Sequence, residues 1–224
     1  MTLDTPMDSL DREAISAMRR SYGEIGIDLP DMDKNPITQF KSWLAEAAAN
    51  NFVVEANAMV LSTVRDGAPS SRTVLLKDVS DAGFTFFTNY QSKKGDEISH
   101  NPKVALLFPW YPMERQVKIT GTTSLISEKE SDEYFKSRPW SSQIGAWASE
   151  QSTPLNSREE LQARFAEYAN RYPEGSEVPR PSHWGGYLVS PNTIEFWQGR
   201  YSRLHDRIKY QRSETGWKLS RIFP

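Results

Sequence analysis

Apolar and polar positions change their period along this chain, and the change separates predicted helices from predicted strands. Asn35 and Pro36 form a helix start, and apolar residues in the run that follows, such as Phe40, Trp43 and Ala47, fall on one face. Alternation with a period of two begins after residue 58 and is regular over residues 116–126. The pattern predicts helices at 8–22, 36–51, 96–100, 128–137 and 157–171, and strands at 59–64, 72–77, 83–89, 104–110, 116–126, 184–189, 194–198, 207–212 and 217–222.

Two sets of strands are therefore separated by helices. Short strands joined by turn signals favour antiparallel pairing, and strands from both ends of the chain can complete one barrel if the helices fold over its outside. We predict an α+β fold, with an antiparallel β-barrel and helices packed around it, as a single domain over residues 1–224.

Composition narrows the chemistry more than the fold. The 224 residues carry 27 Lys and Arg against 29 Asp and Glu, so the net charge of -2 offers no general field for nucleic acid or an acidic membrane. The absence of cysteine excludes thiolate metal sites and cysteine nucleophiles, and three histidines make a histidine-built metal site improbable, so no metal is expected. No apolar stretch approaches 18 residues, and a cytoplasmic location is expected.

A cationic cluster near the end of the chain is the strongest candidate for chemistry. Arg203, His205 and Arg207 lie between the predicted strands 194–198 and 207–212. On a strand these three side chains would face the same way and form an anion-binding surface suited to a phosphorylated or carboxylated small molecule. The alternative is an ordinary solvated basic face.

Other stretches also place cations or hydroxyls together. Arg72 and Lys77 are five apart and would point to opposite faces of a strand, while residues 92–95 combine a hydroxyl, two lysines and a helix start as a phosphate cradle. On a helix, the four-residue spacing of Tyr134, Arg138 and Ser142 would align their side chains. A solvated turn or helix face remains the alternative for each. The chain lacks a Gly-rich dinucleotide loop and a Gly-x-Ser-x-Gly elbow.

Taken together, these blocks resemble the pyridoxine 5′-phosphate oxidase family. The resemblance runs in order from Arg19 to Pro224 and is most specific in the terminal block. The blocks that carry it are 72–77, 87–94, 114–117, 134–139, 142–152, 184–186 and 194–207.

The resemblance implies a flavin-binding split β-barrel that works as a homodimer, with FMN held noncovalently between subunits. It assigns to FMN Arg72, Thr73, Val74, Leu75, Leu76, Lys77, Phe87, Thr88, Lys93, Lys94, Gln116, Gln151, Ser152, Trp197 and Arg207. It assigns to the substrate Arg19, Arg20, Ser21, Tyr22, Lys77, Tyr134, Arg138, Ser142, Arg203, Leu204 and His205, with Arg203 and His205 as the catalytic pair. Residues 1–30 would form a partly mobile amino-terminal segment that includes a lid.

The implied reaction is oxidation of pyridoxine 5′-phosphate and pyridoxamine 5′-phosphate to pyridoxal 5′-phosphate, with O2 as acceptor and hydrogen peroxide as product. One alternative is a related FMN oxidase of another aromatic substrate, such as a phenazine-pathway intermediate. The other is a carrier of flavin, haem or pyridoxal phosphate without turnover. The presence of Lys77, Tyr134, Arg138 and Ser142 together favours the vitamin B6 substrate.

Overall fold

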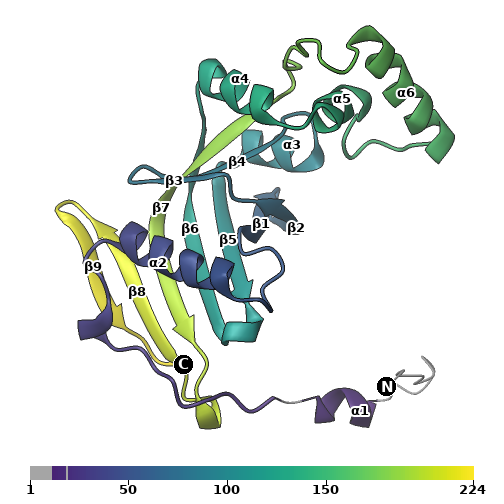
Figure 1. Ribbon diagram of the computed structural model, residues 1–224. Helices are drawn as coiled ribbons and strands as arrows, with labels where there is room; N and C mark the ends of the chain where they lie inside the picture. Colours follow the sequence, from purple (N-terminus) through teal and green to yellow (C-terminus); the bar gives the residue numbers. More distant parts are fainter. Residues whose placement is uncertain (1–11, 19) are drawn as a thin grey trace.

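One antiparallel sheet of nine strands organises the computed structural model, which describes residues 12–18 and 20–224. The strand order is β2-β1-β5-β6-β7-β4-β3, and β8 joins this path on β7 and carries β9 (Figure 1). The strands are β1 Ala58–Arg65, β2 Ala68–Leu75, β3 Asp78–Ser80, β4 Gly83–Asn89, β5 Lys103–Trp110, β6 Arg115–Leu125, β7 Trp184–Gln198, β8 Asp206–Ser213 and β9 Gly216–Arg221. The helices are α1 Arg12–Ala17, α2 Pro36–Ala49, α3 Lys93–His100, α4 Glu128–Ser137, α5 Trp140–Ala148 and α6 Arg158–Arg171, with short 3-10 turns η2 Leu29–Asp31, η3 Tyr111–Met113 and η4 Tyr201–Arg203.

The long strand β7 divides the sheet into two branches. β6 pairs with β7 over residues 187–198, whereas on its other edge β7 pairs first with β4 and then, from Thr193 onward, with β8. The β6–β7 register shifts between Thr120 and Gly121. An added Cβ at Gly121 would overlap the carbonyl of Ser190, so glycine permits the close approach of β7 there. The prediction of two strands at 184–189 and 194–198 was wrong, because this bulge bends the strand without ending it.

Helix α2 covers the core as predicted. Its N-cap, Asn35, accepts a hydrogen bond from the backbone N–H of Ile37 at 2.9 Å. Phe40 is fully buried and meets Phe84 and Phe108 at ring-centroid distances of 5.0 and 4.9 Å, and Trp43 packs on Phe196. Figure 1 shows α2 lying across the sheet, and the buried residues of α2 are those of the predicted face.

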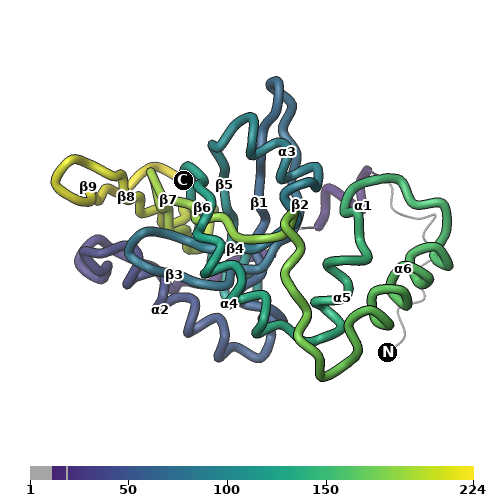
Figure 2. The backbone as a smooth tube through the Cα atoms, turned by 90° about the horizontal axis from the view of Figure 1, so that it is seen from above, coloured from purple at the N-terminus to yellow at the C-terminus, as the bar shows by residue number. Residues whose placement is uncertain are grey.

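A second hydrophobic cluster lies among α4, α5 and the start of β7. It is built on Phe135, Ile144, Val178 and Trp184. Figure 2 shows α5 and α6 at the opposite end of the molecule from β8 and β9. Helix α5 was not predicted, because its Gly- and Ser-containing sequence carries a weak apolar period.

Other boundaries differ from the sequence prediction by local causes. Helix α1 covers only Arg12–Ala17 instead of 8–22, of which residues 8–11 and 19 lie outside the described residues. Helix α3 begins three residues early because the buried Ser92 caps it. Strand β2 ends at Leu75, so Lys77 lies in the link to β3. The antiparallel α+β class is confirmed, and no helix among the described residues is long and apolar enough to cross a membrane.

Candidate functional site

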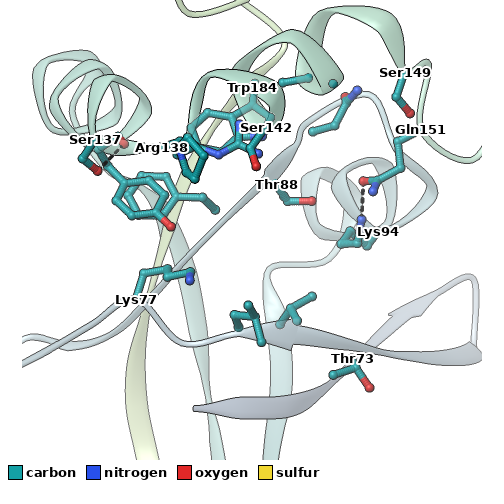
Figure 3. Close-up of a pocket in the computed structure, with 18 residues that line it drawn as sticks. Thr73, Lys77, Thr88, Lys94, Ser137, Arg138, Ser142, Ser149, Gln151 and Trp184 are labelled. Carbon is teal, nitrogen blue, oxygen red and sulfur yellow. Dashed lines mark hydrogen bonds between the residues drawn. The ribbon is translucent and has the colours of Figure 1, made fainter. Parts of the chain in front are cut away.

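A cavity of about 670 Å³ opens between the upper end of the sheet and the helices α3, α4 and α5 (Figure 3). Its volume lies within the range of small-molecule sites. Eleven predicted residues line it: Thr73, Val74, Leu75, Lys77, Phe87, Thr88, Lys94, Tyr134, Arg138, Ser142 and Gln151. Asn89, Ser137, Pro139, Gly145, Ala146, Ser149 and Trp184 complete the lining and were not assigned to the site from the sequence. Trp184 could have been assigned to the site from the sequence, because it begins one of the blocks that carry the family resemblance.

The cavity has cations on two sides. Figure 3 shows Lys94 beside Gln151 on one side and Arg138 near Ser142 on the other, with Lys77 below Arg138. Lys94 at one end of the cavity and Arg138 with Lys77 at the other suit two anionic groups better than one.

Arg138 brings to the cavity a cation with one unsatisfied donor among the described residues. Its Nη1 atom is buried and has no hydrogen-bond partner among the described residues. Its guanidinium lies 4.6 Å from the ring centroid of Trp184 and 5.5 Å from that of Phe135. Burial lowers the pKa of Arg138, as expected for a cation removed from water. A buried donor without an acceptor is costly, so a ligand oxygen is the natural partner.

Stacked aromatic rings form a wall beside Arg138. Phe87 and Tyr134 stack with centroids 3.9 Å apart, and Phe87 and Trp184 stack at 5.4 Å. These rings come from β4, α4 and β7, and their packing holds the Tyr134 side chain at the cavity. The wall suits a planar aromatic ligand.

The four-residue spacing of Tyr134, Arg138 and Ser142, which on a helix would align them, does not fall within one helix. Tyr134 lies in α4, Arg138 is its C-cap with extended backbone angles, and Ser142 lies in α5. Pro139 restricts Arg138 to this extended conformation and starts the next helix. All three residues nevertheless line the same cavity. Gln143 of α5 donates to the carbonyl oxygens of Phe135 and Lys136, which ties the start of α5 to the end of α4.

Lys94 marks the other cationic side, at the first turn of α3. Its ammonium donates to Gln151 Oε1 at 2.7 Å and to Ser92 Oγ at 3.1 Å. Burial, and then the positive charge of Arg72, lower the pKa of Lys94 to about 8. The start of α3 adds free backbone N–H groups, so this side combines the usual elements of a phosphate site.

A second hollow holds predicted flavin residues far from the first. Gln116, Trp197 and Arg207 line a cavity of about 230 Å³ together with Lys118 and Glu195. Arg207 is fixed there by a hydrogen bond from Nε and an ion pair from Nη2 to Glu195 Oε1, each at 2.7 Å. Trp197 stands thirteen positions after Trp184 on β7, roughly 40 Å along an extended strand. The two cavities share no lining residue, and Trp197 lines only the second of them.

The predicted catalytic pair lies at the same distant end. Arg203 and His205 are in the β7–β8 connection, and only Arg207 lies in a strand, so the expected shared strand face was wrong. Ser202 and Arg203 have φ of 57° and 62°, which breaks any alternation. His205 packs on Trp197 with centroids 4.7 Å apart, and burial followed by the charge of Arg203 lowers the pKa of His205.

The predicted lid residues lie beside this pair. The ring of Tyr22 meets His205 at 5.4 Å and Trp197 at 5.7 Å. Arg20 pairs with Glu114 at 3.5 Å. Ser21 is exposed, Leu204 is 69% exposed, and Arg19 lies outside the described residues.

Four predicted flavin residues do not line either cavity. Arg72 turns to Glu97, Leu76 is buried in the core, Lys93 is exposed on α3, and Ser152 lies exposed in a turn with φ of 75°. No cluster of three His, Asp or Glu side chains in the described part of the chain is placed to hold a metal ion.

Comparison with protein families gives two matches that together cover most of the chain. A family described as pyridoxamine 5′-phosphate oxidase matches residues 45–172, and the pyridoxine 5′-phosphate oxidase C-terminal dimerisation region matches residues 184–224. A pyridoxine/pyridoxamine 5′-phosphate oxidase of Rubrobacter xylanophilus is 52% identical over 214 residues, covering 95% of this chain and 98% of the relative. One from a Cyanothece species is 49% identical over 212 residues, covering 94% and 99%.

Solved structures agree with the fold. The structure of PhzG from Burkholderia lata, in complex with tetrahydrophenazine-1-carboxylic acid, has a TM-score of 0.84 at 32% identity and covers 92% of this chain and 100% of that one. A pyridoxamine 5′-phosphate oxidase-related, FMN binding protein from Nostoc punctiforme has a TM-score of 0.67 at 17% identity, covering 83% and 97%, and supports the fold alone.

Proposed function

Because this chain belongs to the pyridoxine/pyridoxamine 5′-phosphate oxidase family, we propose that its 670 Å³ cavity is where FMN and a phosphorylated pyridine substrate meet. The chain is an FMN-dependent oxidoreductase that converts pyridoxine 5′-phosphate and pyridoxamine 5′-phosphate to pyridoxal 5′-phosphate. Bound FMN would supply the two-electron acceptor for the hydride lost from the C4′ carbon of the substrate, and O2 with one proton would take up that hydride as hydrogen peroxide. The cytoplasmic location stays a prediction from the sequence.

The observation that carries this proposal is the buried Nη1 atom of Arg138, which has no partner among the described residues. In the proposal, the substrate phosphate binds there, held by Arg138 and Lys77 as cations and by the hydroxyls of Tyr134 and Ser142. Charge-assisted hydrogen bonds of this kind are short and strong. The stacked ring of Phe87 keeps Tyr134 in place, so the phosphate fixes where the pyridine ring lies.

The opposite side of the cavity takes the flavin phosphate. The ammonium of Lys94 and the first N–H groups of α3 are the nearest donors, and Thr73, Thr88 and Gln151 supply further polar groups along the wall. These donors fit a phosphorylated cofactor. Arg72 and Lys93 add positive charge behind them.

A second copy of the chain completes the site in this proposal. The C-terminal region that matches a dimerisation region contains Trp197, near the end of β7, and Arg203, His205 and Arg207, which follow that strand. Trp184, which lines the cavity, lies at the other end of β7. In a symmetric dimer the same residues of a partner subunit can face the cavity. Arg203 and His205 then act on the substrate ring, with Tyr22 packed over His205. The cavity, the sheet and both ends of the chain form one functional domain in this proposal.

The activity is tested on the purified protein through its flavin spectrum. We expect FMN absorption that bleaches on anaerobic addition of pyridoxine 5′-phosphate and returns with air, with release of pyridoxal 5′-phosphate and peroxide. Bleaching by a phenazine carboxylic acid and not by pyridoxine 5′-phosphate would favour the PhzG-like alternative, which the similarity to that structure motivates. A protein that binds no FMN would exclude both.

The shared site is tested by mixing two inactive variants. Lys77→Met removes a group on the cavity side, and Arg203→Met removes one on the dimerisation side. If each site uses Lys77 of one subunit and Arg203 of the other, random mixed dimers regain about a quarter of wild-type sites. Mixtures that stay inactive, although mixed dimers form, would show that the two residues act from one chain.

A further inference from the structure

The buried carboxylate of Glu97 has no part in the site described so far. Glu97 is on α3, is 4% exposed, and does not line either cavity that holds predicted residues. Its Oε2 atom accepts from Thr63 Oγ1 at 2.6 Å and from Arg72 Nη2 at 2.8 Å. Ser70 Oγ donates to the same carboxylate at 2.7 Å. Three donors converge on one buried anion.

These bonds keep Glu97 ionised. Burial alone would raise the pKa of Glu97, but the hydrogen bonds from Thr63, Ser70 and Arg72 more than offset it and lower the pKa. Thr63 Oγ1, on β1, and the Leu61 carbonyl also accept from Arg72 Nη1, at 2.6 and 3.3 Å. Ser70 Oγ accepts from Nη2 beside Glu97, so four groups hold the guanidinium. The consequence is a fixed orientation for Arg72.

Arg72 is held next to the cationic side of the cavity. It is close enough to Lys94 for its charge to lower the pKa of that lysine, and Lys93 Nζ lies 3.9 Å from Glu97 Oε1. The Arg72 side chain remains 21% exposed. Both terminal nitrogens of its guanidinium donate to protein acceptors, so Nε–H is the donor left for a ligand among the described residues. Arg72, Lys93 and Lys94 against Glu97 leave a local charge of +2, which matches a phosphomonoester dianion.

We propose that Glu97 is a positioning residue for the flavin phosphate, which it serves by holding Arg72 beside the first turn of α3. The inference rests on the proposed function, because it assumes that FMN binds at this side of the cavity. Glu97 itself touches no ligand. It prevents the Arg72 side chain from moving away into solvent and preserves the geometry for a charge-assisted hydrogen bond.

The direction in which Glu97→Gln changes FMN affinity distinguishes a positioning role of Glu97 from a purely electrostatic one. Glu97→Gln removes a negative charge near a phosphate, so Coulomb attraction alone would tighten FMN binding. Loss of a held guanidinium would instead weaken FMN binding by roughly 10- to 150-fold, the value of one charge-assisted hydrogen bond. Asp96→Asn is the matched control, since this neighbour undergoes the same charge change but pairs with Arg65.

The experiment measures FMN and riboflavin binding to protein freed of flavin, by quenching of flavin fluorescence. For Glu97→Gln we expect weaker FMN binding and riboflavin binding within about twofold of wild type, because riboflavin has no phosphate. Asp96→Asn should bind FMN as wild type or slightly tighter. Glu97→Asp keeps the charge at a shorter reach and should give an intermediate loss; it also serves if Glu97→Gln does not fold.

Two results would overturn the inference. FMN binding by Glu97→Gln that equals or exceeds wild type would show that Arg72 needs no positioning. Equal losses for FMN and riboflavin would show a general structural role. Failure of the proposed function is a separate outcome, since wild-type protein would then bind no FMN and form no pyridoxal 5′-phosphate.

Discussion

Replacing Arg138 with Met tests whether this arginine contributes to ligand binding and not to the stability of the ligand-free protein. Methionine keeps the length and apolar packing of the side chain but removes its donors. An unsatisfied buried donor costs about 1–3 kcal/mol, and the cation–π contacts with Trp184 and Phe135 return about 0.5–2 kcal/mol. The free energy of unfolding of the ligand-free Arg138→Met protein should therefore stay within about 2 kcal/mol of wild type.

The effect on substrate should be much larger. A charged hydrogen bond to phosphate contributes about 1.5–3 kcal/mol, so kcat/KM for pyridoxine 5′-phosphate should fall roughly 10- to 150-fold. At a pyridoxal 5′-phosphate concentration of about 100 times the wild-type Kd, binding stabilises wild type by about 2.7 kcal/mol, or roughly 5–10 °C in Tm. The weakened Kd leaves the variant with less than about 1.4 kcal/mol at that concentration.

The assay is thermal unfolding of the FMN-loaded enzyme with and without pyridoxal 5′-phosphate, beside steady-state kinetics. Arg171→Met is the matched control, because Arg171 lies over the Tyr168 ring at 5.6 Å on the exposed α6. Equal ligand-induced Tm shifts in Arg138→Met and wild type would refute the assignment. So would an unchanged kcat/KM.

Titration and packing give four more tests. FMN affinity should fall as pH rises through about 8, approaching tenfold per pH unit, because Lys94 of the flavin-free protein then loses its proton. Lys94→Gln should remove this pH dependence, and a Lys94→Gln profile equal to that of wild type would contradict the assignment. The free energy of unfolding of the flavin-free protein should change with pH in the opposite direction and rise with pH. A depressed lysine pKa contributes stability that is present above the unfolded value of 10.5 and is lost as pH falls through about 8. Urea unfolding at several pH values measures this change. Arg203→Gln should raise the pKa of His205 in an NMR titration by removing the nearby positive charge, whereas no change would place Arg203 too far to act on it. Gly95→Ala should destabilise by about 1–3 kcal/mol because its Cβ would overlap backbone, whereas Gly145→Ala, with open space, should be neutral or gain up to about 1 kcal/mol; equal values would refute the packing argument.

The sequence determined the features that depend on near neighbours. The Asn35 cap and the face of Phe40 and Trp43 lie within a few turns of one helix, so their pattern sufficed to place α2 against the sheet. The alternation over residues 116–126 gave β6 for the same reason. The order of cationic and aromatic blocks also sufficed to identify the family and its cofactor.

Only the tertiary structure decided which of these residues, from distant segments of the chain, lie together. Pro139 splits Tyr134 and Ser142 between two helices, yet both residues line one cavity. Arg72 is turned toward a carboxylate 25 residues away. The two halves of β7 choose different partners and carry the two parts of the predicted site to opposite ends. A local pattern specifies a strand and its faces, but the partners of that strand depend on register and ion pairs between distant segments, which no short window of sequence contains.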